Sequence, residues 1–265
     1  MSTTNGNPQK STNTASSEDE DKQARIALQR IITMSLLAGL CPAIPIPFLD
    51  DMALRFIRKR ALRSEFERQG LRPGRAQLDV FLQERSRLLG CLSSILIYPI
   101  KKLFRKVSFV LAVKDCVDAA SWTFHTLWMV RHAMVKGLFS NADLGVEVDA
   151  LRGLRLAVDA ASQQVDTRPF HQMWKRALGA SRAWIRQGGR ALGKMIRFKG
   201  GRSTAPETVE RAVQDVEPLD IGEVDEVANR LGEQMWAERG YLRAVERAFE
   251  THWARYRAAS ASPTS

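Results

Sequence analysis

Residues that build disulfide frameworks and metal centres are scarce in this chain. Among its 265 residues there are four histidines and three cysteines, Cys41, Cys91 and Cys116. The cysteines are odd in number, far apart and surrounded by apolar residues, which fits neither a disulfide framework nor the ligand spacing of a zinc site. We therefore expect buried, reduced thiols, and no cofactor.

Strand signals are also missing. No segment shows a sustained alternation of apolar and polar residues, rich in β-branched side chains, between turn-forming residues. The sequence predicts an all-α multi-helix bundle, with a hydrophobic N-terminal half over residues 22–139 and an amphipathic helical layer over residues 140–259. Residues 1–21 lack large apolar side chains after Met1 and are expected to form a disordered tail, as are residues 260–265.

Signatures of common catalytic sites are absent as well. The chain contains neither a Gly-x-Ser-x-Gly elbow nor a His-Glu-x-x-His motif. Gly188 to Met195 comes close to a phosphate-binding loop, but Met195 stands where a Ser or Thr would hold magnesium, and an amphipathic helix precedes it where a strand is needed. The sequence thus supplies no catalytic residue, although it does not by itself exclude an enzyme.

We expect no targeting signal at the N-terminus. Residues 1–25 lack the apolar segment of a signal peptide, and Ser2 excludes N-myristoylation. We expect the protein to be cytoplasmic, at the inner face of the membrane.

Turning to what is present, an uncharged stretch runs from Ile31 to Leu49. It is long enough to cross a bilayer, but Pro42, Pro45 and Pro47 interrupt any helix within it. We expect an apolar helix over residues 22–40, an extended elbow, and a new helix that begins with two aspartates. The bent apolar segment either inserts shallowly into a membrane or forms a soluble core.

Further helices are expected along the rest of the chain. Breakers and apolar periodicity place them at residues 50–69, 75–97, 114–139, 147–165, 169–198, 206–216 and 222–259. Residues 88–100 carry no charge, which suits a buried or partly inserted helix.

Charge is strongly positive and unevenly distributed. The net charge is +11 and the isoelectric point about 10.0. Residues 167–206 contain no acidic side chain, whereas residues 207–265 carry a net negative charge, so we expect acidic C-terminal helices. Such a field favours anionic partners, namely phospholipid head groups, nucleic acid, or acidic segments of the same chain.

The basic helix over residues 169–198 is the sharpest surface feature. Its cations at successive intervals of four residues are Arg182, Arg186, Arg190 and Lys194. They form one stripe, with Trp174 and Trp184 on the same helix, a pattern typical of an interfacial helix with Trp at head-group depth. The alternative is that its apolar side packs on the core while its arginines pair with the acidic C-terminal region.

A second basic cluster precedes the central apolar helix. It consists of Lys101, Lys102, Arg105 and Lys106, interleaved with large apolar residues. We expect it to contribute to the same membrane-binding or anion-binding surface.

Carboxylates and histidines suggest one further, polar site. Its candidate members are Asp50, Asp51, Asp115, Asp118, His125 and His132. The two N-terminal aspartates are well explained as first-turn helix residues. The two histidines, seven residues apart, are separated by about 10.5 Å along a helix, too far to share one metal ion easily. Structural polar residues and a functional site both remain open.

The elbow resembles a known family. The sequence Pro45-Ile46-Pro47-Phe48-Leu49-Asp50, preceded by an Ala/Gly/Leu-rich helix and followed by another helix, resembles a motif of the YcjF-type bacterial domain of unknown function. The resemblance covers residues 26–62. It implies a bacterial, membrane-proximal helical protein of unknown biochemistry and supplies no active site.

Together these features predict a non-enzymatic peripheral membrane or scaffold protein. Its expected partner is an anionic membrane surface or another protein. Two alternatives stay open: a nucleic-acid-binding helical protein, supported by the basic helices, and an enzyme with a carboxylate and histidine site between helices.

Overall fold

The all-α prediction is confirmed. The computed structural model describes residues 9–46, 48–82, 109–140, 142–143, 148–179, 182–199, 205–216 and 224–261. Over these ranges it contains α-helices and one 3-10 turn, and no strand. The elements are α1 (Gln9–Leu40), η1 (Cys41–Ala43), α2 (Leu49–Arg68), α3 (Arg75–Leu82), α5 (Phe109–Val135), α7 (Val148–Gln164), α8 (Arg168–Gly179), α9 (Arg182–Lys199), α10 (Pro206–Gln214), α11 (Val224–Ala237) and α12 (Arg239–Ala261).

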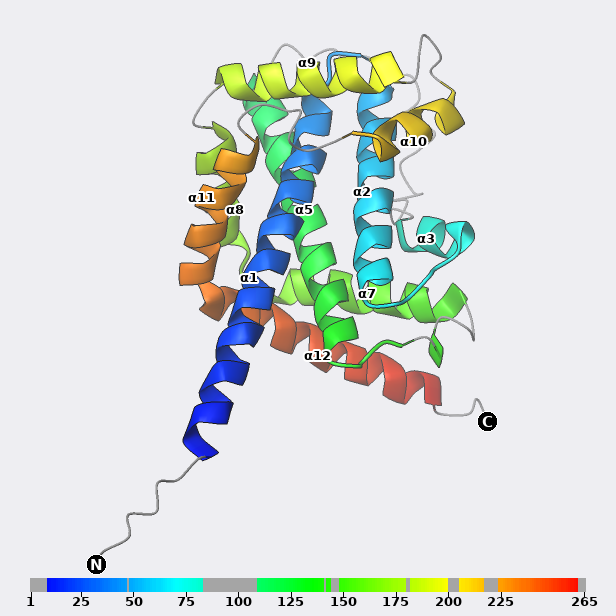
Figure 1. Cartoon of the computed structure of the whole chain (residues 1–265). Helices are drawn as coiled ribbons and strands as arrows, with labels where there is room; N and C mark the ends of the chain where they lie inside the picture. Colours follow the sequence, from blue (N-terminus) through cyan, green and yellow to red (C-terminus); the bar gives the residue numbers. More distant parts are fainter. Residues whose placement is uncertain are drawn as a thin grey trace, which may run out of the picture.

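Three long helices form the centre of the bundle. In Figure 1, α1 rises to the elbow, α2 returns beside it, and α5 runs along both. The approach of α1 to α5 is close because Gly39 has no side chain: a Cβ there would lie 2.9 Å from Ala120 Cβ and 3.0 Å from the carbonyl oxygen of Cys116. A single apolar core joins residues of the N-terminal and C-terminal regions.

The elbow follows from its prolines. Pro42 lies in the 3-10 turn after Leu40, and Ile44 is extended (ψ 123°), as expected for a residue before a proline. Phe48 then adopts a left-handed conformation (φ 67°) immediately before α2 begins at Leu49. The predicted helix–elbow–helix unit is therefore confirmed, and the end of the first helix and both ends of the second agree within one residue.

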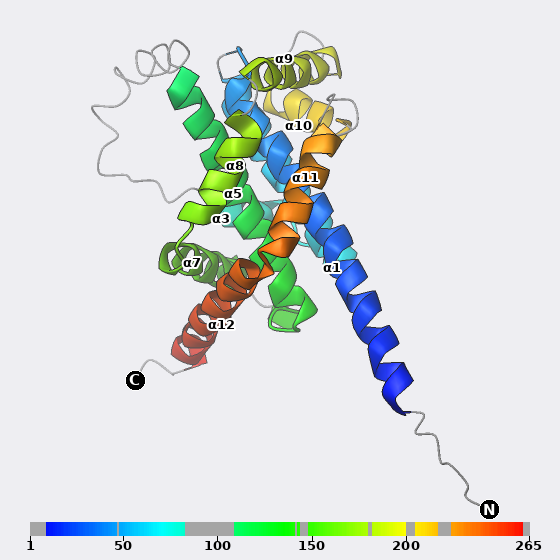
Figure 2. The same ribbon diagram turned by 90° about the vertical axis from the view of Figure 1, so that its left-hand side faces the viewer.

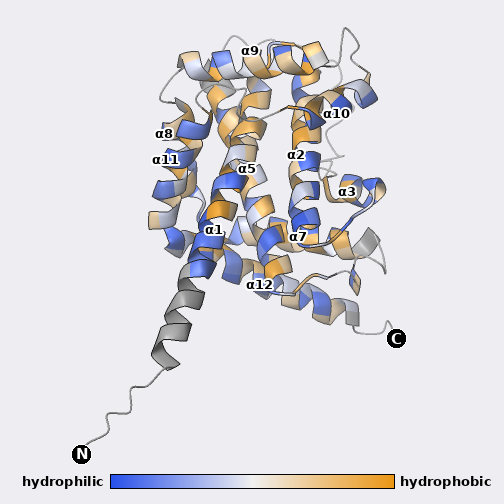
Figure 3. Cartoon of the chain, viewed as in Figure 1, coloured by the Kyte–Doolittle hydropathy of each residue, from blue (hydrophilic) through white to orange (hydrophobic). Residues whose placement is uncertain are grey.

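The apolar stretch of α1 is a core helix in this fold. Ile31, Ile32, Leu36 and Leu40 are completely buried. Asp19–Ala43 is long and apolar enough to cross a membrane, yet 67% of its most apolar window is buried inside the protein. Figure 3 shows hydrophobic residues, in orange, recurring along the central helices α1, α2 and α5. The sequence leaves open whether the bent apolar segment inserts into a membrane or forms a core. In the structure, residues 31–41 of this segment contribute to the core.

Several predicted boundaries were wrong. α1 begins at Gln9, inside the segment expected to be a disordered tail. The expected helix over residues 169–198 is two helices, α8 and α9, because α8 packs along α5 whereas α9 crosses the end of the bundle (Figures 1 and 2). The expected helix over residues 222–259 is also divided, at Glu238. The helix expected over residues 75–97 is described only to Leu82.

The acidic character expected of the C-terminal helices is also wrong for the last one. α11 has two acidic residues in its first turn. In contrast, α12 contains five arginines and two glutamates. The net charge of residues 207–265 is negative as a whole, so it did not indicate that α12 is itself positively charged.

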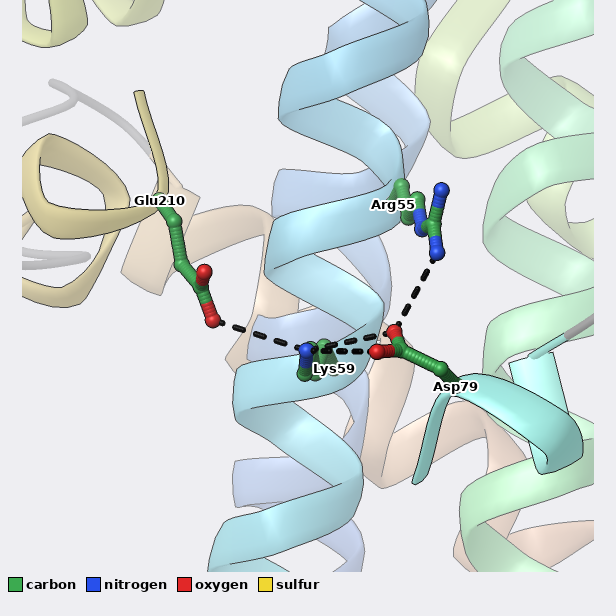
Figure 4. Close-up of polar contacts among 4 residues, drawn as sticks. All are labelled: Arg55, Lys59, Asp79 and Glu210. Atoms are coloured by element: carbon green, nitrogen blue, oxygen red, sulfur yellow. Dashed lines mark hydrogen bonds and ion pairs between the residues drawn. The ribbon is translucent and has the colours of Figure 1, made fainter. Parts of the chain in front are cut away.

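One buried lysine ties three helices together. Lys59 of α2 has only 8% of its side chain exposed, and its Nζ lies 3.1 Å from Asp79 Oδ1 of α3 and 3.6 Å from Glu210 Oε1 of α10 (Figure 4). Exposed Arg55 reaches the same Asp79 oxygen at 3.2 Å. A buried cation is tolerated here because two carboxylates flank it.

Replacing Lys59 by methionine is expected to lower the free energy of unfolding by about 1–3 kcal/mol, because two neighbouring carboxylates lose the charge between them. The matched control is Arg55→Met, which removes an exposed partner of the same Asp79 and should cost less than about 1 kcal/mol. Urea unfolding of both variants measures the difference. Equal losses would show that Lys59 contributes no more than a surface cation.

Candidate functional site: the outer face of α9

The apolar side of α9 docks onto the elbow. Ile185, Leu192 and Ile196 are buried, and the glycines of α9 allow its backbone to come close. A Cβ on Gly189 would lie 2.7 Å from backbone atoms of Ala43, and one on Gly193 would lie 3.1 Å from Ile44 Cγ2. The stretch that resembles a phosphate-binding loop is thus a helix-packing surface.

The opposite side of α9 is cationic and exposed. Its exposed cations are Arg186, Arg190, Lys194 and Arg197. At 100° per residue these four positions fall within an arc of about 80°, so they share one face. The predicted stripe is therefore present for three of its members, whereas for Arg182 only the backbone is described. Arg197 was missed, although its spacing of eleven residues from Arg186 completes three helical turns.

Two large aromatic side chains are exposed at the same end of the bundle. Phe198, beside the cations, is 88% exposed, and Phe48, at the tip of the elbow on which α9 rests, is 67% exposed. They are the two most exposed large apolar residues in the part of the chain that the structure describes. Neither was singled out from the sequence, where an isolated Phe carries no signal of exposure.

Within the described ranges, no carboxylate forms an ion pair with Arg190, Lys194 or Arg197. The nearest acidic helix, α10, directs Glu210 to Lys59. The alternative that the α9 stripe is neutralised by the acidic C-terminal region is therefore not seen for these three cations. Their charge is available to an external anion.

The two tryptophans expected at the membrane surface are not there. Trp174 is fully buried, with its ring centroid 5.8 Å from that of Phe170 and 6.3 Å from that of Phe124. Trp184 is 8% exposed. The prediction that they lie at head-group depth is wrong, because the apolar sides of α8 and α9 pack into the core.

The cluster Lys101, Lys102, Arg105 and Lys106 and the uncharged run 88–100 lie outside the described residues, as does Cys91. Cys41 and Cys116 are buried and carry thiols that form no disulfide, as expected. Burial raises the pKa of the Cys41 thiol well above its ordinary range, so this thiol stays protonated.

The carboxylates and histidines do not converge. Asp50 and Asp51 lie in the first turn of α2, as predicted, with Asp50 buried and Asp51 exposed. On α5, Asp115 and His132 are separated by about 25 Å of helical rise. Among the described residues, no group of three or more His, Cys, Asp or Glu side chains is placed to hold a metal ion.

His132 and Asp118 take part in ordinary structural contacts. His132 Nε2 donates to Glu250 Oε1 of α12 at 2.8 Å, and its Nδ1 lies 3.7 Å from Glu246 Oε1. Asp118 is exposed and accepts a hydrogen bond from Lys114 at 2.5 Å. His132 thus connects α5 to α12, whereas Asp118 lies on the surface.

His125 is buried and neutral, and its hydrogen bond to Tyr241 connects α5 to α12. Its Nδ1 lies 2.7 Å from the carbonyl oxygen of Ser121, so Nδ1 carries the proton and Nε2 accepts from Tyr241 Oη at 2.6 Å. Burial is the main cause that lowers the pKa of His125 to about 4. The imidazole therefore stays uncharged down to acidic pH.

We expect His125 to make the fold acid-sensitive. In the unfolded chain its pKa is about 6.5, so stability is complete above that pH and is lost as the pH falls from about 6.5 toward 4, by up to about 3 kcal/mol. Urea unfolding between neutral pH and pH ~4.5 should show a smaller pH dependence in His125→Gln than in the wild type. Parallel pH profiles of the two proteins would contradict this.

Comparison with protein-family models, with curated proteins and with solved structures finds no match for this chain. The similarity of the elbow to the YcjF-type domain therefore remains a resemblance of one segment.

Proposed function

We propose that the protein is a non-enzymatic peripheral membrane protein that binds anionic lipid through the outer face of α9, at the cytoplasmic side of a membrane. The observation that carries the proposal is the combination on one exposed face of four cations with an 88% exposed Phe198. Basic residues attract anionic head groups, and an exposed aromatic ring gains free energy on entering the acyl boundary.

The orientation of α9 supports this proposal. It lies across the end of the bundle and presents its length outward (Figure 1). Its 18 residues span about 27 Å, enough to contact several head groups at once. Each cation near an anionic membrane contributes about 1 kcal/mol, and burial of one Phe about 1.5–3 kcal/mol. Such a surface binds reversibly.

Vesicle flotation tests the proposal. Vesicles of phosphatidylcholine alone, or mixed with phosphatidylglycerol, are incubated with the protein at low and at physiological ionic strength, with and without competing duplex DNA. We expect flotation with anionic vesicles only, weakened by salt because charge contributes most of the attraction. Failure to float under every condition would overturn the proposal.

Nucleic-acid binding is the second candidate, since the same cations suit phosphates of either kind. The exposed Phe48 and Phe198 favour lipid, because duplex phosphates offer an aromatic ring no apolar partner. DNA that abolishes flotation and binds with a steep salt dependence would favour this alternative.

A further inference from the structure

A second cationic face lies on α12, at the other end of the bundle. The inner side of α12 packs through Leu242, Val245, Phe249 and Trp253, all buried. The exposed arginines of α12 are Arg239, Arg243, Arg247, Arg255 and Arg257, and Arg257 forms an ion pair with Asp143. At 100° per residue, Arg243, Arg247 and Arg255 fall within an arc of about 120°, wider than the arc of the α9 cations.

Both acidic residues of α12 contact side chains of α5, although 43% of the Glu250 side chain remains exposed. Glu246 accepts a hydrogen bond from Trp128 Nε1 at 3.0 Å, and Glu250 is held by His132 at 2.8 Å. Arg239, at the near end of the stripe, lies 3.6 Å from Asp21 of α1 and stacks on Trp236. The uncompensated part of the face therefore begins at Arg243.

Arg243, Arg247 and Arg255 form no ion pair with any carboxylate of the described ranges. The other exposed residues between Arg243 and Arg255 are Thr251 and Ala254, which are small and uncharged. The exposed side chains beside these arginines are thus small, and none of them is a large apolar one. Attraction by this face is purely electrostatic, unlike that of α9.

The two cationic faces cannot meet one flat membrane together. α9 rests on the elbow, where α1 ends and α2 begins, whereas α12 is fastened to the far half of α5 through His125, Trp128 and His132 (Figures 1 and 2). The 27 residues of α5 extend about 40 Å, which exceeds the thickness of a head-group layer. A second anionic surface would have to approach α12 from elsewhere.

We propose that the protein tethers two anionic membrane surfaces, one bound by α9 and the other by Arg243, Arg247 and Arg255 of α12. This inference rests on the proposed function of α9. The α12 face binds weakly by itself, because it has three available arginines and no apolar anchor. It becomes effective once α9 holds the protein on the first membrane and raises its local concentration.

Capture of free vesicles by surface-immobilised vesicles tests this inference, both populations being phosphatidylcholine mixed with phosphatidylglycerol. The triple variant Arg243→Gln, Arg247→Gln, Arg255→Gln should float with vesicles within about twofold of the wild type but capture at least about tenfold fewer free vesicles. The matched control, Arg68→Gln, Arg72→Gln, Arg75→Gln, removes three other exposed arginines and should capture normally. A triple Arg→Lys variant at positions 243, 247 and 255 should also capture normally, provided that all variants unfold at the wild-type temperature.

The outcomes separate the two proposals. A wild-type protein that does not float disproves the role of α9. A wild-type protein that floats without capturing vesicles disproves tethering alone. Capture that survives the triple Gln variant also disproves it, because tethering would then arise from self-association or another surface.

Discussion

Neutralising the outer face of α9 is expected to reduce binding to anionic vesicles by about 100- to 1000-fold, because each of its cations contributes about 1 kcal/mol near the surface. The variant carries four Gln substitutions, at Arg186, Arg190, Lys194 and Arg197. All four side chains are exposed, so the fold should keep its stability within about 1 kcal/mol. Partitioning at physiological ionic strength is measured by co-sedimentation with increasing lipid.

A control of equal charge makes this result specific. Gln at Arg68, Arg72, Arg75 and Lys136 also removes four exposed cations, but none from α9. This variant should bind within about threefold of the wild type, because long-range attraction is screened beyond about 8 Å at physiological salt. If both variants lose binding equally, net charge and not the α9 face is responsible.

The second large effect is expected at Gly189. Substitution by valine should lower the free energy of unfolding by about 2–4 kcal/mol, because the new side chain would overlap the backbone of Ala43 and force α9 off the elbow. Backbone atoms cannot move aside as a flexible side chain can. Thermal and urea unfolding measure the loss, and vesicle binding should weaken in parallel as α9 loses its position.

Gly240 provides the matched control for this substitution. It lies in a helix, like Gly189, but a Cβ there meets no atom within 4 Å. Gly240→Val should therefore change stability by less than about 1 kcal/mol. A Gly189→Val variant as stable as Gly240→Val would show that α9 does not depend on close contact with the elbow.

Local chemistry accounts for what the sequence predicted correctly. The end of α1 and the start of α2 follow from Pro42 and Pro45, whose effect on the backbone does not depend on distant residues. The stripe of Arg186, Arg190 and Lys194 follows equally from helical spacing. Such features can be read from a few neighbouring residues.

Tertiary packing decides what the sequence could not show. The division of the basic segment into α8 and α9 places Trp174 in the core against Phe124, a residue fifty positions earlier, and no local pattern specifies that contact. The exposure of Phe198 depends likewise on where α9 ends relative to the bundle. The positive charge of α12 was not recognised from the sequence, because the net charge was summed over α11 and α12 together. The sequence did not reveal the boundary between these helices at Glu238.

The most direct measurement of the central claim is quenching of tryptophan fluorescence by brominated phospholipids. All six native tryptophans are buried or half-buried, so the wild type supplies a constant background. In vesicle-bound protein, Phe198→Trp should add a strongly quenched component, whereas Ile26→Trp, exposed on α1 away from α9, should add an unquenched one. Quenching of both variants alike, or of neither while the protein is bound, would contradict attachment through the outer face of α9.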